Sequence, residues 1–338
     1  MPTTRELRDR IGSIDSTMKI TNAMYLISST KMRKAKTELA QTEPYFYTLQ
    51  SMIARVMRHL PEGYSHPYLD LREEVSNGKG RVAIICITAD KGLAGAYNHN
   101  VIKETEALLK EYSNSRLFVV GEMGRSYFHS RNIPIEEAFH YTAQNPTLHR
   151  ARVITRKMME YFEDREIDEL HIVFTRMKNS LEMECEEEQL LPLDKLHPVF
   201  VKLPITANYE AFNIFPNTDA LIDNIIPDYI NGYIYSALVE AFCAEQQARM
   251  TSMDAANRNG NELKQKLRIQ YNRARQAQIT QEITEIAAGA KAQKAAKKKN
   301  KERRRGKCRQ EKLSRLWDLL WMWSLWKPHF PRLRRPWL

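Results

Sequence analysis

The sequence predicts a fold of mixed α+β and α/β class: an antiparallel coiled coil of long N- and C-terminal helices with an α/β domain inserted between them. Three observations indicate this fold. Near the N-terminus, apolar and small residues recur at alternating spacings of four and three, as in a coiled-coil seam. In the middle of the chain, short apolar runs alternate with helical segments. A long proline-free stretch of strong helix formers follows Pro227.

The N-terminal coiled-coil helix is expected over residues 1–60. Thr3 or Thr4 can cap it, and Glu6 then lies in the first turn, where a negative charge is favourable. The seam lasts for nearly five heptads and consists of Leu7, Ile11, Ile14, Met18, Thr21, Tyr25, Ser28, Met32, Ala35 and Leu39. Pro44 is expected to kink or interrupt this helix.

The α/β domain is expected over residues 75–205. Residues 81–88 (RVAIICIT) form a continuous apolar run, typical of a strand buried on both faces. Two further strands, at 117–121 and 170–175, alternate with helical segments, which predicts a parallel sheet. Residues 180–191 are expected to add a strand with an acidic outer face.

The C-terminal coiled-coil helix is expected within residues 215–290, from Asp228 to about Ala288. Such a helix would be roughly 90 Å long and could not bury itself in a globule, so it needs a partner helix. The N-terminal helix is the natural partner, but it is shorter. The excess near residues 270–288 carries apolar side chains all round, and it therefore needs a sleeve of other protein.

Residues 291–338 form a basic, Trp-rich tail. They hold 17 Lys or Arg against three acidic residues, a net charge of +14, and all five Trp of the chain. The other 290 residues carry 35 bases and 38 acids, a net charge of −3. The positive net charge of the whole chain is therefore no argument for nucleic-acid binding, and we expect no nucleic-acid partner. The apolar run at 316–326 is too short to span a bilayer.

Two interpretations of this tail stay open. Its basic stretch and Trp residues are typical of a segment that lies on anionic lipid. The abrupt change of composition near residue 292 fits an accidental extension better. We expect removal of residues 294–338 to leave the protein functional, and we expect no direct membrane insertion.

No motif of a catalytic, cofactor or metal site stands out. The sequence has no GxxxxGK[ST], GxSxG or HExxH. The glycines of residues 91–98 (KGLAGAYN) are expected to shape a turn rather than bind a nucleotide. Cys86 lies in an apolar strand and is expected to be a packed core thiol. Residues 182–188 are expected to be a solvated acidic face rather than a cation site.

Other features concern partners and compartment. The cluster at 31–36 and the arginines at 268, 273 and 275 place positive charge on both predicted helices, which favours an acidic partner surface. The four cysteines are too dispersed for a disulfide framework and suit a reducing compartment.

Four segments resemble the gamma subunit of F-type ATP synthases: ITNAMYLISSTKMRKAK (20–36), TADKGLAGAYNHNVIK (88–103), YSALVEAFCAEQQARMTSMDAANRN (235–259) and NRARQAQITQEITEIAAGAKA (272–292). The resemblance spans about residues 1–292. It implies a non-catalytic rotor shaft without cofactors, whose terminal helices lie inside a hexamer of alternating alpha and beta subunits. It also implies a Rossmann-like middle domain that binds no nucleotide.

The resemblance further implies neighbours and a location. The middle domain would sit against the epsilon subunit and the membrane c-ring, on the cytoplasmic face of a bacterial membrane. The shaft would couple flow of protons or sodium ions to ATP synthesis.

Residue roles follow from the same resemblance. Met24 matches a methionine that faces an acidic loop of the beta subunit, and Arg249 matches an arginine opposite it on the second helix. Arg275 and Gln276 match a pair that contacts the beta subunit. Thr280 and Glu282 match residues whose changes alter coupling. The full set of expected partner-contact and coupling residues is Met24, Lys31, Arg33, Arg249, Arg275, Gln276, Thr280 and Glu282.

Two other functions compete with that of a rotor. An enzyme whose helices merely dimerise is disfavoured, because no nucleophile–base pair or phosphate-binding loop is present in the sequence. A non-rotary coiled-coil scaffold with an α/β cap remains the alternative, although it gives no reason for the apolar excess of the second helix.

Overall fold

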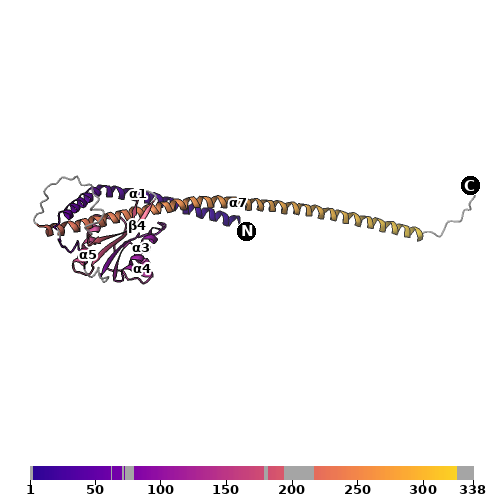
Figure 1. Cartoon of the computed structure of the whole chain (residues 1–338). Helices are drawn as coiled ribbons and strands as arrows, with labels where there is room; N and C mark the ends of the chain where they lie inside the picture. The colour runs from indigo at the N-terminus through magenta and orange to yellow at the C-terminus, as the bar shows by residue number, and fades with distance from the viewer. Residues whose placement is uncertain are drawn as a thin grey trace, which may run out of the picture. The chain divides into compact units, whose positions relative to one another are not determined.

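The computed structural model describes residues 3–61, 63–70, 72, 80–178, 182–193 and 217–325. The chain divides into two compact units (Figure 1). The first unit comprises Met1–Gly12 and Lys264–Leu338, and the second unit comprises Ser13–Leu263. The structure is mostly helical, with a four-stranded mixed sheet in the second unit.

Helix α1, Thr4–Arg58, begins at a reciprocal cap. The N–H of Glu6 donates to Thr3 Oγ1 at 3.2 Å, and the N–H of Thr3 donates to Glu6 Oε2 at 3.3 Å. The helix continues through Pro44, so the expected interruption does not occur. An interior proline costs about 3 kcal/mol. Burial of Leu49 and Ile53 beyond it offsets this cost.

Helix α7, Thr218–Leu325, is longer than predicted at both ends. Pro227 lies inside it rather than before it, because Ile222 and Ile226 are buried and hold the first turns against the core. At the other end, residues 291–325 contain no proline and are rich in Ala, Lys and Arg, which favour helix. The described part of the basic tail is therefore a continuation of α7.

Within the second unit, α1 and α7 run antiparallel in a constant register. Thr21 Oγ1 donates to Asn257 Oδ1 at 2.5 Å. A Cβ added to Gly260 would stand 2.9 Å from Met18 Cγ. The two residue numbers of each pair add to 278, as they also do where Phe46 meets Gly232.

This register corrects one expectation. It places residue 24 level with residue 254, whereas Arg249 lies five residues earlier in α7, or about 7–8 Å away along the helix axis. Met24 and Arg249 are therefore not side by side across the helix pair. The predicted antiparallel direction of the two helices is observed within the second unit.

The sheet has the strand order β2-β1-β3-β4. The strands are β1 Val82–Ile87, β2 Ser115–Val120, β3 Glu169–Met177 and β4 Met183–Leu191. All four were expected from the sequence. Strand β1 is parallel to both β2 and β3, whereas β4 is antiparallel to β3. The sheet is mixed because the link between β3 and β4 is too short for a parallel crossover.

Helices cover both faces of the sheet. Helices α3 (Tyr97–Glu111) and α4 (Glu122–Ser130) pack on one face, with Val101 and Phe128 buried against Ile84. Helix α5 (Leu148–Glu163), together with α1 and α7, packs on the other face. The second unit thus joins the helix pair to the α/β domain through one shared apolar core.

Buried charges pair within the α/β domain. Asp168 accepts from Arg72 at 2.9 Å and from Arg81 at 3.1 Å. Burial of Asp168 disfavours its charge, yet the bonds from Arg81 and Arg72 lower its pKa to about 2. His171 lies between Glu187, at 2.7 Å, and Glu169, at 3.3 Å.

Among the described residues, no helix carries an apolar stretch long enough to cross a membrane.

Candidate functional site

The predicted site residues fall into two groups, one in each unit. In the second unit, Met24 and Lys31 are half-buried and Arg33 is exposed on α1, whereas Arg249 is buried on α7. In the first unit, the four predicted residues are exposed on α7: Arg275, Gln276, Thr280 and Glu282. The exposed and half-buried residues of each group therefore form a separate candidate contact surface, and buried Arg249 belongs to neither.

The exposed group in the first unit shares its helix with apolar side chains. Ile279, Ile283 and Ile286 are 44%, 61% and 73% exposed. Polar bonds between neighbouring turns fix the side chains around them, as where Gln278 donates to Glu282 Oε1 at 3.2 Å. Isoleucines that face water on a helix mark a surface for another protein.

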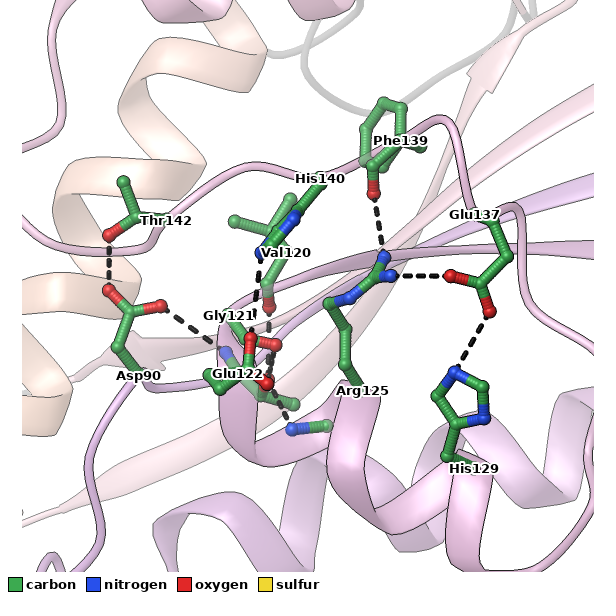
Figure 2. A network of polar contacts seen from close by, with 12 residues as sticks. Asp90, Val120, Gly121, Glu122, Arg125, His129, Glu137, Phe139, His140 and Thr142 are labelled. Atoms are coloured by element: carbon green, nitrogen blue, oxygen red, sulfur yellow. Dashed lines mark hydrogen bonds and ion pairs between the residues drawn. The ribbon is translucent and has the colours of Figure 1, made fainter.

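A more enclosed site lies at the carboxyl ends of β1 and β2. The carboxyl-edge loop, residues 88–96, leaves β1 here and bonds to the first turn of α4 (Figure 2). The N–H groups of Glu122, Met123 and Gly124 donate to Asp90 Oδ1, the Ala89 carbonyl and Thr88 Oγ1, at 3.2, 3.0 and 3.0 Å. In many α/β domains this edge of the sheet and such a helix N-terminus bind phosphate. Here the chain's own acceptors take those donors.

Asp90 joins the loop to the segment after α4 as well. Thr142 donates its hydroxyl hydrogen to Asp90, and the N–H of Gln144 donates to Asp90 Oδ2 at 3.0 Å. Figure 2 shows Asp90 between Thr142 and the start of α4. A carboxylate at this position repels a phosphate, so the geometry supports the interpretation of residues 91–98 as a structural turn.

Side chains of α4 also hold the segment that follows this helix. Arg125 donates to the Phe139 carbonyl at 3.1 Å and forms an ion pair with Glu137 at 2.7 Å, which His129 also contacts (Figure 2). Glu122 and His140 lie 3.5 Å apart. The carboxyl edge is thus cross-braced by polar contacts.

Arg249 of α7 closes the remaining side of the carboxyl-edge loop. Its Nη2 donates to the carbonyl oxygens of Lys91 and Gly92 at 2.9 and 3.1 Å. Its Nη1 donates to Glu245 Oε1 at 2.6 Å, one helical turn earlier. Arg249 and Glu245 are only 7% and 2% exposed, so this ion pair is shielded from water. We name Arg249, Glu245 and the two carbonyl groups the loop clamp.

Small and aromatic residues let the loop approach α7. Ala244 and Ala248 pack against Ala89, Ala94 and Tyr97 in one apolar cluster. At Gly95, φ is +58°, and an added Cβ would stand 2.9 Å from Ser252 Oγ. Glycine is therefore favoured at this position for its conformation, and a side chain here would meet Ser252.

Burial shapes the acid–base properties of this region. It raises the pKa of Glu245, whereas the neighbouring Arg249 acts in the opposite direction. Burial also raises the pKa of Tyr97 well above its ordinary value. Cys86 is fully buried in β1, which raises the pKa of its thiol to about 12 and confirms the predicted core thiol.

Sequence reasoning missed Glu245, Asp90 and Tyr97. The available signal was the Glu-x-x-x-Arg spacing of Glu245 and Arg249 directly after the apolar run at 241–244, because two charges on a buried helix face need partners. Among the described residues, no group of three or more His, Cys, Asp or Glu side chains could hold a metal ion.

Comparisons with known proteins agree over most of the chain. A family model described as "ATP synthase" matches residues 3–293. The ATP synthase gamma chain of Ruminiclostridium cellulolyticum is 41% identical over 290 residues, which is 85% of this chain and 98% of the relative. That of Acetivibrio thermocellus is 40% identical over 294 residues, 86% of this chain and 98% of the relative.

Solved structures share the fold at low sequence identity. A chain of the mitochondrial ATP synthase of Euglena gracilis matches with a TM-score of 0.58 and 17% identity, covering 87% of this chain and 95% of its own length. A chain of the central stalk and c-ring structure from Tetrahymena thermophila has a TM-score of 0.50 and 21% identity, covering 70% of this chain and 99% of its own.

Proposed function

The chain belongs to the family of ATP synthase gamma chains, and we propose that it is the central rotor shaft of an F-type ATP synthase, coupling ion flow to ATP synthesis. The observation that carries this proposal is 41% identity to a gamma chain over nearly the whole of that relative. The shaft itself is not catalytic. Catalysis takes place in the beta subunits, and the shaft changes their conformation.

The mechanism requires contacts that differ between orientations. A rotor can shift the equilibrium of a catalytic subunit only if the contact energy changes as it turns. The antiparallel α1–α7 pair, which we take to be a coiled coil, is asymmetric around its axis. At any moment the three beta subunits therefore meet different side chains, and each is held in a different state.

We assign a separate set of contacts to each of the two groups of site residues. Exposed residues of the first unit, with Ile279 and Ile283 among them, would face the apolar sleeve formed by the alpha and beta subunits. Arg275, Gln276, Thr280 and Glu282 would supply the polar contacts to that sleeve. Met24, Lys31 and Arg33 would contact an acidic loop of the beta subunit, which suits the basic surface there.

The α/β domain, which we take to be Rossmann-like, would link the shaft to the epsilon subunit and the c-ring. The complex would lie at the cytoplasmic face of a bacterial membrane, with this chain attached through its partners rather than inserted in lipid. No nucleic-acid partner belongs to this account. The segments 1–60, 75–205 and 215–290 would act as N-terminal helix, transmission domain and C-terminal helix, with residues 291–338 outside the functional shaft.

Native co-purification tests this function. The tagged chain, extracted from its own membranes in mild detergent, is expected to recover alpha and beta subunits and ATP hydrolysis activity. The alternative, a non-rotary scaffold, predicts recovery of other proteins. A pull-down that contains neither alpha nor beta subunits would overturn the proposal.

A further inference from the structure

Among the described residues, polar contacts attach the α/β domain to α7 at the loop clamp and at Arg176, in very different surroundings. At the loop clamp, the side chains of Arg249 and Glu245 are 8% and 3% exposed. Nearer the N-terminus of α7, Glu240 pairs with Arg176 of β3 at 3.0 Å, but the side chains of Arg176 and Glu240 are 38% and 23% exposed. Water competes for the second pair and much less for the first, so the loop clamp is the stiffer attachment.

The geometry of the clamp makes Glu245 its organising residue. Glu245 touches only one edge of the Arg249 guanidinium, and this contact orients the opposite edge toward the carbonyl groups of Lys91 and Gly92. The guanidinium is rigid and planar, so a bond at one edge fixes the other. Without the carboxylate, a buried and unbalanced charge would turn outward to solvent and release the loop.

We propose that Glu245 is a positioning residue that, through Arg249, locks the carboxyl-edge loop to α7 so that the α/β domain and the shaft turn as one body. This inference rests on the proposed rotor function. The loop is braced to β2 and α4 through Thr88 and Asp90, so a force on the domain reaches α7 at Lys91 and Gly92. Loss of the clamp allows slippage between the domain and the shaft.

The test uses the complete ATP synthase in membrane vesicles, with ATP hydrolysis and ATP-driven ion pumping measured on the same preparation. Glu245→Leu is expected to lower pumping per ATP hydrolysed by about threefold or more, because it removes a charge-assisted bond. Hydrolysis itself is expected to persist. Glu245→Gln keeps a neutral bond and is expected to give an intermediate ratio. The matched control, Glu240→Gln, is expected to stay near the wild-type ratio.

A covalent replacement for the clamp separates positioning from general damage. Residues 95 and 252 are close enough for a disulfide, since a Cβ at 95 would stand 2.9 Å from Ser252 Oγ. In the Glu245→Leu background, Gly95→Cys with Ser252→Cys is expected to restore the pumping ratio on oxidation and to lose it again on reduction. Gly95→Cys alone is expected to restore nothing.

Two results would overturn the proposal: an unchanged ratio in assembled Glu245→Leu complexes, or a lowered ratio that a verified 95–252 disulfide does not restore. If Glu245→Leu does not assemble, Glu245→Gln with the same cysteine pair decides by the same two criteria. Failure of the wild-type chain to assemble with alpha and beta subunits would instead refute the rotor function, so the two failures are distinguishable.

Discussion

Gly232 of α7 lies against the ring of Phe46 of α1, so closely that an added Cβ would overlap the ring. The Phe46 ring also packs against Tyr235, with ring centroids 6.1 Å apart, and has little room to move. The two helices therefore pack closely at a point where one of them has no side chain.

Gly232→Ala is expected to destabilise the second unit by about 1–3 kcal/mol, because overpacking outweighs the gain in helix propensity. Gly12→Ala is the matched control. Gly12 is also helical, but nothing lies within 4 Å of an added Cβ there. The control is expected to be neutral or to stabilise by up to about 1 kcal/mol. Denaturant unfolding of the purified chain measures both changes, and equal effects of the two substitutions would contradict the observed packing.

The helix register gives a cross-linking prediction. Met18→Cys with Gly260→Cys is expected to form a disulfide on mild oxidation, because a Cβ at 260 would stand 2.9 Å from Met18 Cγ. Met24→Cys with Arg249→Cys is expected to stay reduced, because these positions are about 7–8 Å apart along the axis alone. Mobility in non-reducing gels separates the two cases. Efficient cross-linking of 24 to 249 would show that the register is wrong.

The strands and helices were predictable from the sequence because their signals are local. The apolar run at 81–88 and the reciprocal cap at Thr3 and Glu6 depend on neighbours alone. Passage of α1 through Pro44 was not predictable, since it depends on packing against a helix far away in sequence. The loop clamp was not predictable either, because Arg249 bonds to the carbonyl groups of Gly92 and Lys91, which lie 157 and 158 positions earlier in the sequence.

His171 makes the stability of the α/β domain depend on pH. Burial alone would lower its pKa, but the bonds to Glu169 and Glu187 raise the pKa from 6.5 to about 9. The resulting stabilisation is fully present below pH 6.5 and is lost as the pH rises through about 9. Its upper limit is about 3 kcal/mol.

The difference in unfolding free energy between the wild-type chain and His171→Gln reports this contribution. It is expected to shrink between pH 6.5 and pH 9.5. A difference that stays constant or grows over this range would show that the imidazole is not held in its charged form.

The tail can be tested by truncation. Removal of residues 294–338 is expected to leave ATP-driven ion pumping and vesicle attachment unchanged, because the match to the family ends at residue 293. The exposed Trp317 and Leu320 of the tail favour the rival view, in which an apolar helix after a basic stretch lies on lipid. Detachment of truncated complexes from vesicles, or loss of their pumping, would show that the tail is functional and would contradict this prediction.

The central claim is that this chain rotates within a catalytic hexamer. Ser126 is exposed on α4 and suits a probe attached through Ser126→Cys, once exposed Cys308 is replaced by serine. With the alpha and beta subunits fixed to a surface, ATP is expected to drive the probe in one direction until the nucleotide is exhausted. Complexes that hydrolyse ATP while the probe stays still would contradict the rotor account and support a static scaffold.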